Sequence, residues 1–261
     1  MTAHPDISVV IPARDEIVAL GPLVEEIAQT LAGRAFETII VDDGSTDGTP
    51  HALAALQVRH PWLLALRNDQ PCGQSASIRR GVRAARGALI VTLDGDGQNP
   101  PDQIPTLLTP FTKAGASTLG LVQGERVGRK DTALKRTASR MANAIRRALL
   151  RDGVQDSGCG LKAFRREAYL ELPWFDHIHR FMPAMMLREG WCVETVPVTH
   201  RGRRGGASKY GVITRALVGV PDLLGAAWLI RRAGPSHRQV FEAGQECAFL
   251  EVSTEGVQGT S

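Results

Sequence analysis

Two carboxylates separated by a single small residue offer the clearest chemistry in this sequence. Asp94-Gly95-Asp96 directly follows the apolar run of residues 88–93, and Gln98 lies two residues further on. Carboxylates that leave a strand in this way can turn to the same side and share a divalent cation. Hard oxygen ligands with positions open to water suit an ion that bridges a substrate's phosphates. We therefore predict a Mg²⁺ or Mn²⁺ site formed by Asp94, Asp96 and Gln98.

Two further polar clusters follow apolar runs nearer the N-terminus. Residues 12–16 (PARDE) follow the run 7–11, and residues 42–48 (DDGSTDG) follow the run 38–41. Asp and Gly are also ordinary turn residues, so either cluster alone could be a turn. In an open parallel sheet, however, ligands bind outside the carboxyl ends of the strands. Three acidic clusters at neighbouring strand ends therefore favour one shared site.

The first half of the chain predicts the scaffold that these clusters need. Short apolar runs alternate with segments of helical spacing, and strands that alternate with helices form parallel βαβ units with helices on both faces. We therefore predict an α/β fold with a mostly parallel central sheet flanked by helices. The predicted strands cover residues 7–11, 38–41, 63–66 and 88–93, and the predicted helices cover residues 20–31, 50–58, 74–85 and 103–111.

The second half is more basic and less regular. We predict strands over residues 117–124 and 192–199, helices over residues 132–151, 162–172 and 180–189, and a Gly- and Arg-rich loop over residues 202–211. Residues 212–230 are apolar, but Arg215, Pro221 and Asp222 interrupt them, so they make a poor membrane-spanning segment. We predict a folded domain over residues 1–211, an interfacial amphipathic helix over residues 212–232, and a poorly ordered tail over residues 233–261. An ordinary buried helix is the alternative for residues 212–230.

Charge and composition narrow the classes of function. The formal charge of +4 and pI of about 9.1 favour a polyanionic partner such as nucleic acid, anionic lipid or a phosphorylated substrate. The four cysteines have no paired spacing and the N-terminus no signal-peptide pattern, so we expect a cytosolic protein with reduced thiols. Neither a Gly-x-x-x-x-Gly-Lys-Ser/Thr motif nor a Gly-x-Gly-x-x-Gly motif opens a helix, so metal and arginine must neutralise any bound phosphates.

Several motifs, taken together, resemble those of the family 2 glycosyltransferases, which have a GT-A (nucleotide-diphospho-sugar transferase) fold. They are residues 10–16 (VIPARDE), 41–49 (VDDGSTDGT) and 93–101 (LDGDGQNPP). Further segments resemble the polyprenyl-phosphate branch, typified by dolichol-phosphate mannose synthase: residues 124–126 (GER), 135–140 (KRTASR), 156–162 (DSGCGLK), 179–181 (HRF) and 203–211 (RRGGASKYG). The resemblance implies a GT-A catalytic domain over residues 1–211. It also implies transfer of a hexose from a GDP- or UDP-linked sugar to an undecaprenyl- or dolichyl-type monophosphate, for cell-envelope glycan or protein glycosylation.

The resemblance also implies a role for each matching residue. The donor's base and ribose would contact Pro12, Arg14, Glu16, Val41 and Asp43. The donor phosphates and metal ion would be held by Asp94, Gly95 and Asp96, with Gln98 as a further metal ligand, and covered by Arg203 and Lys209. The acceptor's phosphate would contact Arg126, Arg136 and Ser139, so that the catalytic set is Asp94, Asp96, Arg126 and Arg136.

A lipid monophosphate acceptor would need no catalytic base. The second pKa of the phosphate is about 6, so the acceptor binds largely as the dianion at neutral pH. The enzyme must then position two anions and stabilise the departing nucleotide, which metal and arginine can do without proton transfer. We expect in-line displacement with inversion at the anomeric carbon. We also expect peripheral binding at the inner, cytoplasmic face of the membrane through residues 212–230, next to Arg231 and Arg232.

Three alternatives stay open. A glycosyltransferase for a soluble saccharide or protein hydroxyl acceptor would use the same donor site. A nucleic-acid-binding protein would use the basic segment 132–151, but this leaves the three acidic strand ends unexplained, so we expect no nucleic-acid partner. A nucleotidyltransferase would normally need a Gly-rich first loop with Lys or Arg to grip a triphosphate, and residues 12–16 are not of that kind.

Overall fold

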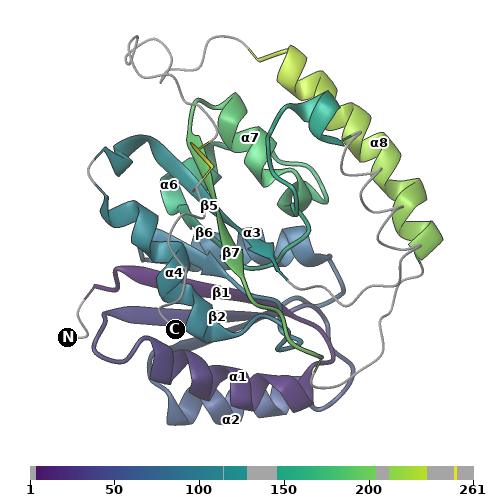
Figure 1. Ribbon diagram of the computed structural model, residues 1–261. Coiled ribbons are helices and arrows are strands. Elements are labelled where there is room, and N and C mark those ends of the chain that lie inside the picture. Colours follow the sequence, from purple (N-terminus) through teal and green to yellow (C-terminus); the bar gives the residue numbers. More distant parts are fainter. Residues whose placement is uncertain (1–3, 114, 128–145, 204–211, 234–249, 252–261) are drawn as a thin grey trace, which may run out of the picture.

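The computed structural model describes residues 4–113, 115–127, 146–203, 212–233 and 250–251. These residues build a central sheet with helices on both faces (Figure 1). The strands are β1 (Ile7–Ala13), β2 (Phe36–Asp42), β3 (Leu63–Arg67), β4 (Leu89–Thr92), β5 (Leu119–Arg126), β6 (Lys162–Arg165), β7 (Cys192–Val198) and β8 (Leu250–Glu251). The α-helices are α1 (Ile17–Thr30), α2 (Thr49–Arg59), α3 (Gln74–Ala84), α4 (Ile104–Leu108), α6 (Arg166–Glu171), α7 (Met182–Arg188) and α8 (Val212–Arg231).

The strand order β3-β2-β1-β4-β6-β5-β7-β8 confirms a mostly parallel sheet. Only β6 runs antiparallel to its neighbours among the described strands, and it lies between β4 and β5. The register places Ala13 beside Asp42 and Val10 beside Thr92. The carboxyl ends of β1, β2 and β4 therefore lie at one edge of the sheet, as the positions of the acidic clusters predict.

The two faces of the sheet carry separate apolar cores. Along β1, Val9 and Ile11 belong to the core formed with α1, α2 and α4, whereas Val10 belongs to the core formed with α3, α6, α7 and α8. Helix α1 turns its apolar face inward through Leu20 and Leu23. Because both faces of the strand are covered, it reads as a continuous apolar run and not as an alternating one.

The predicted helix over residues 162–172 is wrong in its first third. Lys162–Arg165 is strand β6, and only Arg166–Glu171 is helical. Ala163 faces one core and Phe164 the other, so this short segment is buried on both sides between β4 and β5. Periodicity cannot distinguish so short a buried strand from a buried helix.

The predicted helix over residues 103–111 is broken into short pieces. A 3₁₀ turn at Pro101–Gln103 precedes α4, and another at Thr109–Thr112 follows it. Pro105 and Pro110 each stand near the start of a piece, where a missing N–H costs nothing. A proline further inside would remove a helical hydrogen bond, so Pro110 limits the length of α4.

Some predictions fall largely outside the described residues. Of the predicted helix 132–151, the structure describes residues 146–151, of which 146–150 are helical. The predicted loop 202–211 is described as far as Arg203. Within the predicted tail, Leu250–Glu251 forms β8 in parallel with β7.

The apolar segment 212–230 is helical and forms α8, which lies along the outer side of α7 (Figure 1). Ala226 and Ala227 are buried in the core on that side. Val220, Leu224 and Trp228, spaced four residues apart, are instead 58%, 61% and 58% exposed. None of the described helices is both long and apolar enough to cross a membrane.

Glu37, near the start of β2, links β2 by hydrogen bonds to β1 and to the segment before β4. Its Oε1 accepts hydrogen bonds from Ser8 Oγ and Arg86 N, each at 2.7 Å, and its Oε2 accepts one from Arg86 Nε at 2.9 Å. Ser8 Oγ in turn accepts one from Gly87 N at 2.9 Å. Burial would raise the pKa of Glu37, but the hydrogen bonds from Arg86 and Ser8 outweigh it and hold the pKa below its usual value.

We expect Glu37→Gln to lower the free energy of unfolding by about 2 kcal/mol near neutral pH, because a buried charged acceptor is lost. The folded-state pKa lies below the unfolded value of about 4.3, so this stabilisation is present above that value and disappears as the pH falls through the folded-state pKa. Urea denaturation near neutral pH and at about pH 3.5 should show that the difference in unfolding free energy between wild type and variant becomes smaller in acid. An equal difference at both pH values would contradict this account.

The matched control is Glu25→Gln. Glu25 is half-exposed on α1, where its carboxylate lies 3.1 Å from His60 Nε2. An exposed pair of this kind contributes little, so we expect a change below about 0.5 kcal/mol.

Candidate active site

The three acidic clusters meet at the carboxyl edge of the sheet. Asp43 N donates to Ala13 O at 2.8 Å, and Asp15 N donates to Ser45 Oγ at 2.8 Å, which joins the first two clusters. Gly95 lets the third cluster, after β4, lie close to the end of β1. A Cβ at this position would lie 3.0 Å from Pro12 O and 3.1 Å from Ala13 Cβ. Any larger residue would push the turn after β4 away from β1.

Asp94 is held by two side chains and by the backbone of a third segment. Gln74 Nε2, at the start of α3, donates to Oδ1 at 2.9 Å, and Asn99 Nδ2 donates to Oδ2 at 3.2 Å. Gly160 packs directly against the carboxyl group. Burial, and next the negative charge of Asp96, raise the pKa of Asp94 above its usual value. The positive charges of Lys162 and Arg126 act in the opposite direction without outweighing burial and Asp96.

Arg203 connects Asp96 with the end of β1. Its Nη2 donates to Glu16 Oε1 at 2.5 Å, and its Nε lies 3.6 Å from Asp96 Oδ2. The other oxygen of Asp96 accepts a hydrogen bond from Gln98 N at 3.0 Å. The structure thus brings together predicted donor-site residues from β1, from β4 and from the segment after β7.

The chemistry of this carboxylate pair fits a divalent cation. Two neighbouring carboxylates raise each other's proton affinity, and a hard cation between them would relieve that repulsion. Among the described residues, no group of three or more His, Cys, Asp or Glu side chains is arranged as a metal site. Further ligands would therefore come from Gln98, water or substrate phosphates, which is common for Mg²⁺. In this structure Gln98 Nε2 lies 3.5 Å from Arg201 O.

Asp43 is a preorganised acceptor on the α3 side of β2. Its Oδ1 accepts hydrogen bonds from Asn68 Nδ2 and Cys72 N, both at 2.8 Å, and its Oδ2 accepts one from Gly73 N at 2.9 Å. Burial would raise the pKa of Asp43, but these hydrogen bonds and one from Ser77 outweigh it and lower the pKa. Asp43 therefore stays ionised at neutral pH.

The other predicted donor-site residues at the ends of β1 and β2 differ in how far a ligand could reach their side chains. Val41 is fully buried in the core under α3, so a ligand could reach it only through the backbone. Pro12 is half-buried at the end of β1. Arg14 is 39% exposed, and its Nε lies 4.0 Å from Asp15 Oδ2.

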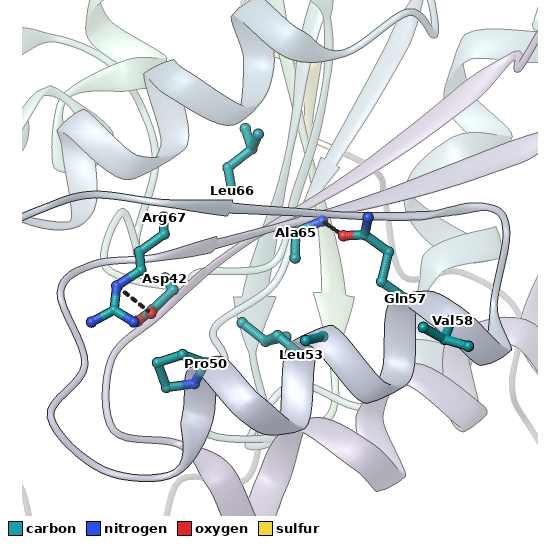
Figure 2. Close-up of a pocket in the computed structure, with 9 residues that line it drawn as sticks. Asp42, Pro50, Leu53, Gln57, Val58, Ala65, Leu66 and Arg67 are labelled. Carbon is teal, nitrogen blue, oxygen red and sulfur yellow. Dashed lines mark hydrogen bonds and ion pairs between the residues drawn. The ribbon is translucent and has the colours of Figure 1, made fainter.

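A shallow pocket of about 380 Å³ lies between α2 and β3 (Figure 2). Asp42 reaches its rim, where its Oδ2 lies 3.7 Å from Arg67 Nε. Gln57 Oε1 accepts a hydrogen bond from Ala65 N at 2.8 Å in the same pocket (Figure 2). Asp42 and Asp43 lie on opposite sides of the sheet, because Asp43 contacts Asn68 and Gly73 beside α3 whereas Asp42 lines the pocket beside α2.

Arg126, predicted to bind the acceptor's phosphate, forms a bidentate ion pair. Its Nε and Nη2 donate to the two carboxyl oxygens of Asp156 at 2.6 and 2.7 Å. Burial would lower the pKa of Arg126, but Asp156 outweighs it and raises the pKa. The pair uses one edge of the guanidinium and leaves Nη1 to point elsewhere. Arg136, Ser139 and Lys209 lie outside the described residues.

Several residues that surround the carboxylates were not assigned a role from the sequence. Gln74 and Asn68 follow the end of β3, and a search of every segment after a strand would have included them. Asp156 and Gly160 belong to the segment 156–162 that carried the resemblance, yet their contacts depend on the antiparallel strand β6. His179, from another such segment, lies 2.7 Å from Ser75 Oγ, and burial lowers its pKa well below the usual value.

Comparison with known proteins gives this arrangement a context. The model of the family "Glycosyl transferase family 2" matches residues 8–172. The chain is 34% identical over 245 residues to a dodecaprenyl-phosphate galacturonate synthase of Rhizobium johnstonii, covering 89% of this chain and 70% of the relative. It is 34% identical over 212 residues to an undecaprenyl-phosphate 4-deoxy-4-formamido-L-arabinose transferase of Pseudomonas aeruginosa, covering 79% of this chain but 61% of the relative.

Solved structures agree on the fold. Glucosyl-3-phosphoglycerate synthase from Mycobacterium tuberculosis, in complex with Mn²⁺, UDP and phosphoglyceric acid, superposes with a TM-score of 0.65 at 20% identity, covering 89% of this chain and 80% of that one. The same enzyme with Mg²⁺ and UDP gives a TM-score of 0.65 at 22% identity, covering 87% and 80%. The fold is GT-A-like, as the motifs predict.

The matched family model spans β1 to α6 and includes all three acidic strand ends. The chain belongs to glycosyl transferase family 2 and is a glycosyltransferase.

Proposed function

We propose that this enzyme transfers a hexose from a GDP- or UDP-linked donor to a polyprenyl monophosphate, with inversion and with Mg²⁺ or Mn²⁺. The observation that carries the proposal is the carboxylate pair Asp94–Asp96, which Gln74, Asn99 and Arg203 hold at the carboxyl edge of the sheet. The acceptor class follows from the two relatives, both of which are named for polyprenyl-phosphate products or substrates.

The donor would lie along the strand ends. Asp43 supplies a fixed anionic acceptor for the base or ribose, with Pro12, Arg14 and Glu16 on the β1 side and Val41 through its backbone. Asp94 and Asp96, with Gly95 between them, would hold the metal-bound diphosphate, with Gln98 as a further ligand. When bound, the cation would supply charge neutralisation for the departing nucleotide.

Arginines would position the two reacting anions. Arg203 already reaches Asp96 and Glu16, so a short movement would bring it over a diphosphate bound there, and Lys209 would assist from the same loop. Arg126 would turn Nη1 towards the acceptor's phosphate while Asp156 holds its other edge, and Arg136 and Ser139 would complete that phosphate site. Because the acceptor is already ionised, no side chain has to remove a proton from it.

The test is direct transfer by the purified full chain. Mg²⁺ or Mn²⁺, a short-chain polyprenyl phosphate and a panel of GDP-mannose, UDP-glucose, UDP-galacturonate and UDP-N-acetylhexosamines are incubated with the enzyme, and mass spectrometry looks for the lipid product. We expect a metal-dependent β-linked sugar phosphate from an α-linked donor, read by NMR. Retention of configuration would exclude the in-line step, and transfer only to a soluble saccharide or peptide would favour the hydroxyl acceptor instead.

We expect Asp96→Ala to reduce transfer by about 100-fold or more, because it removes a charge that holds the donor's metal. Asp96 lies on a turn and contacts Gln98 N and Arg203, so the variant should fold. The control is Asp102→Ala, an exposed carboxylate six residues further on, with transfer expected within about twofold of wild type. Initial rates and thermal melting curves separate lost chemistry from lost structure, and an active Asp96→Ala enzyme would remove the metal proposal.

We also propose that α8 follows the catalytic domain, residues 1–211, as an interfacial helix at the cytoplasmic face of the membrane. Its exposed residues Val220, Leu224 and Trp228 form one stripe, and Arg232 lies 5.8 Å from the Trp228 ring at the end of the helix. An apolar stripe next to basic residues suits the boundary between acyl chains and anionic headgroups.

Replacing both Leu224 and Trp228 with Glu should weaken binding to vesicles containing anionic phospholipid by about tenfold or more, since each buried side chain contributes about 1.5–3 kcal/mol. Vesicle sedimentation measures the binding, and activity towards a water-soluble short-chain acceptor should be retained. The control is Val58→Glu on α2, where the side chain is 85% exposed on another part of the molecule. Equal vesicle binding by the double variant and wild type would exclude this role of α8.

A further inference from the structure

The turn formed by residues 157–161 presses against the Asp94 carboxylate. A Cβ at position 160 would lie 2.2 Å from Asp94 Oδ2 and 2.5 Å from its Cγ, so any side chain there would displace the carboxylate or the turn. The turn is also fastened to β4, because Thr92 Oγ1 donates to Gly160 O at 2.7 Å. Thr92 precedes Asp94 by two residues, so turn and carboxylate are held against each other.

A buried lysine fastens the turn from the other side. Lys162, the first residue of β6, is 3% exposed, and its Nζ donates to Ser157 O at 3.1 Å and to Cys159 O. A buried ammonium group is costly unless it is hydrogen-bonded, and here two backbone carbonyls of the turn accept from it. Burial lowers the pKa of Lys162 to about 8, although Asp94 and Asp156 act in the opposite direction.

A second buried side chain shares the Cys159 carbonyl with Lys162. Gln123 on β5 is fully buried, and its Nε2 donates to Gly124 O at 2.9 Å and lies 3.3 Å from both Asp156 O and Cys159 O. The backbone of the turn is therefore held by two neighbouring strands. No comparable support acts on Asp96 among its described contacts, which are Gln98 N and Arg203.

We propose that the turn 157–161, held by Lys162, is a rigid support that fixes the Asp94 carboxylate for the donor, and that Gly160 and Lys162 are positioning residues. The inference rests on the proposed role of Asp94 in donor binding. A carboxylate displaced by about half an ångström to one ångström loses much of its contribution to binding and catalysis. The turn supplies one wall of the Asp94 site, and Gln74 and Asn99 supply the others.

Gly158 and Gly160 give a matched pair for the test. A methyl group on Gly160 meets the Asp94 carboxylate, whereas a methyl on Gly158 would lie 3.6 Å from Arg126 Nη2 and 3.8 Å from Asp156 Oδ1, which is ordinary contact. We expect Gly160→Ala to raise the dissociation constant of Mn²⁺ with UDP or GDP, whichever nucleotide the wild type binds, by about tenfold or more. We expect Gly158→Ala to stay within about twofold of wild type.

Lys162→Met keeps the length of the side chain and removes its donors. We expect it to raise the donor KM and the Mn²⁺–nucleotide dissociation constant together by about tenfold. Isothermal titration and initial rates measure these values, and thermal melting reports folding. If Lys162→Met does not fold, Gly160→Ala carries the test alone.

The outcomes separate this inference from the proposed function. Equal nucleotide affinity and rate in Gly160→Ala and Gly158→Ala, with an active wild type, would overturn the positioning role. So would a lower melting temperature in Gly160→Ala with unchanged affinity, since that shows a structural role alone. A wild-type enzyme that neither binds Mn²⁺–nucleotide nor transfers sugar would instead count against the proposed function.

Discussion

The burial of Asp94 next to the negative charge of Asp96 is the constraint on which this site depends. Two carboxylates at the end of a single short strand are unfavourable unless the fold holds them there, and burial makes the cost larger. The protein meets that cost with hydrogen-bond donors from α3 and from the turn after β4, and with an ion pair from Arg203 in the segment after β7. An acidic centre kept in this way is prepared for a cation and for the phosphates that the cation would carry.

The sheet makes this arrangement possible because the carboxyl ends of β1, β2 and β4 lie at the same edge. Parallel pairing of β1 with β2 and β4 brings segments about eighty residues apart in the chain to one edge. The antiparallel strand β6 then adds what parallel strands cannot. Its amino end lies beside the carboxyl end of β4, so the turn that precedes it lies against Asp94, with Cys159 and Leu161 in the core formed with α1, α2 and α4.

The sequence predicted the parallel half of the fold well, because each strand from β1 to β4 is a short apolar run followed by a turn and a helix. The helix prediction at residues 162–172 was wrong because β6 is only four residues long and buried on both sides, where periodicity carries no information. The acidic strand ends could be predicted to meet. The bidentate pair of Arg126 with Asp156 could not, since the two residues are thirty positions apart in the sequence and only the fold places them together.

The contact between Gln57 and Ala65 has a consequence at the far side of the sheet. Strand β3 is the outermost strand there, and an outermost strand offers its unpaired backbone groups to any other extended chain. The N–H of Ala65, in the middle of that strand, already donates a hydrogen bond to Gln57 Oε1. A second molecule that tried to extend the sheet at β3 would have to displace this amide first, so the side chain of α2 discourages edge-to-edge association of the domain.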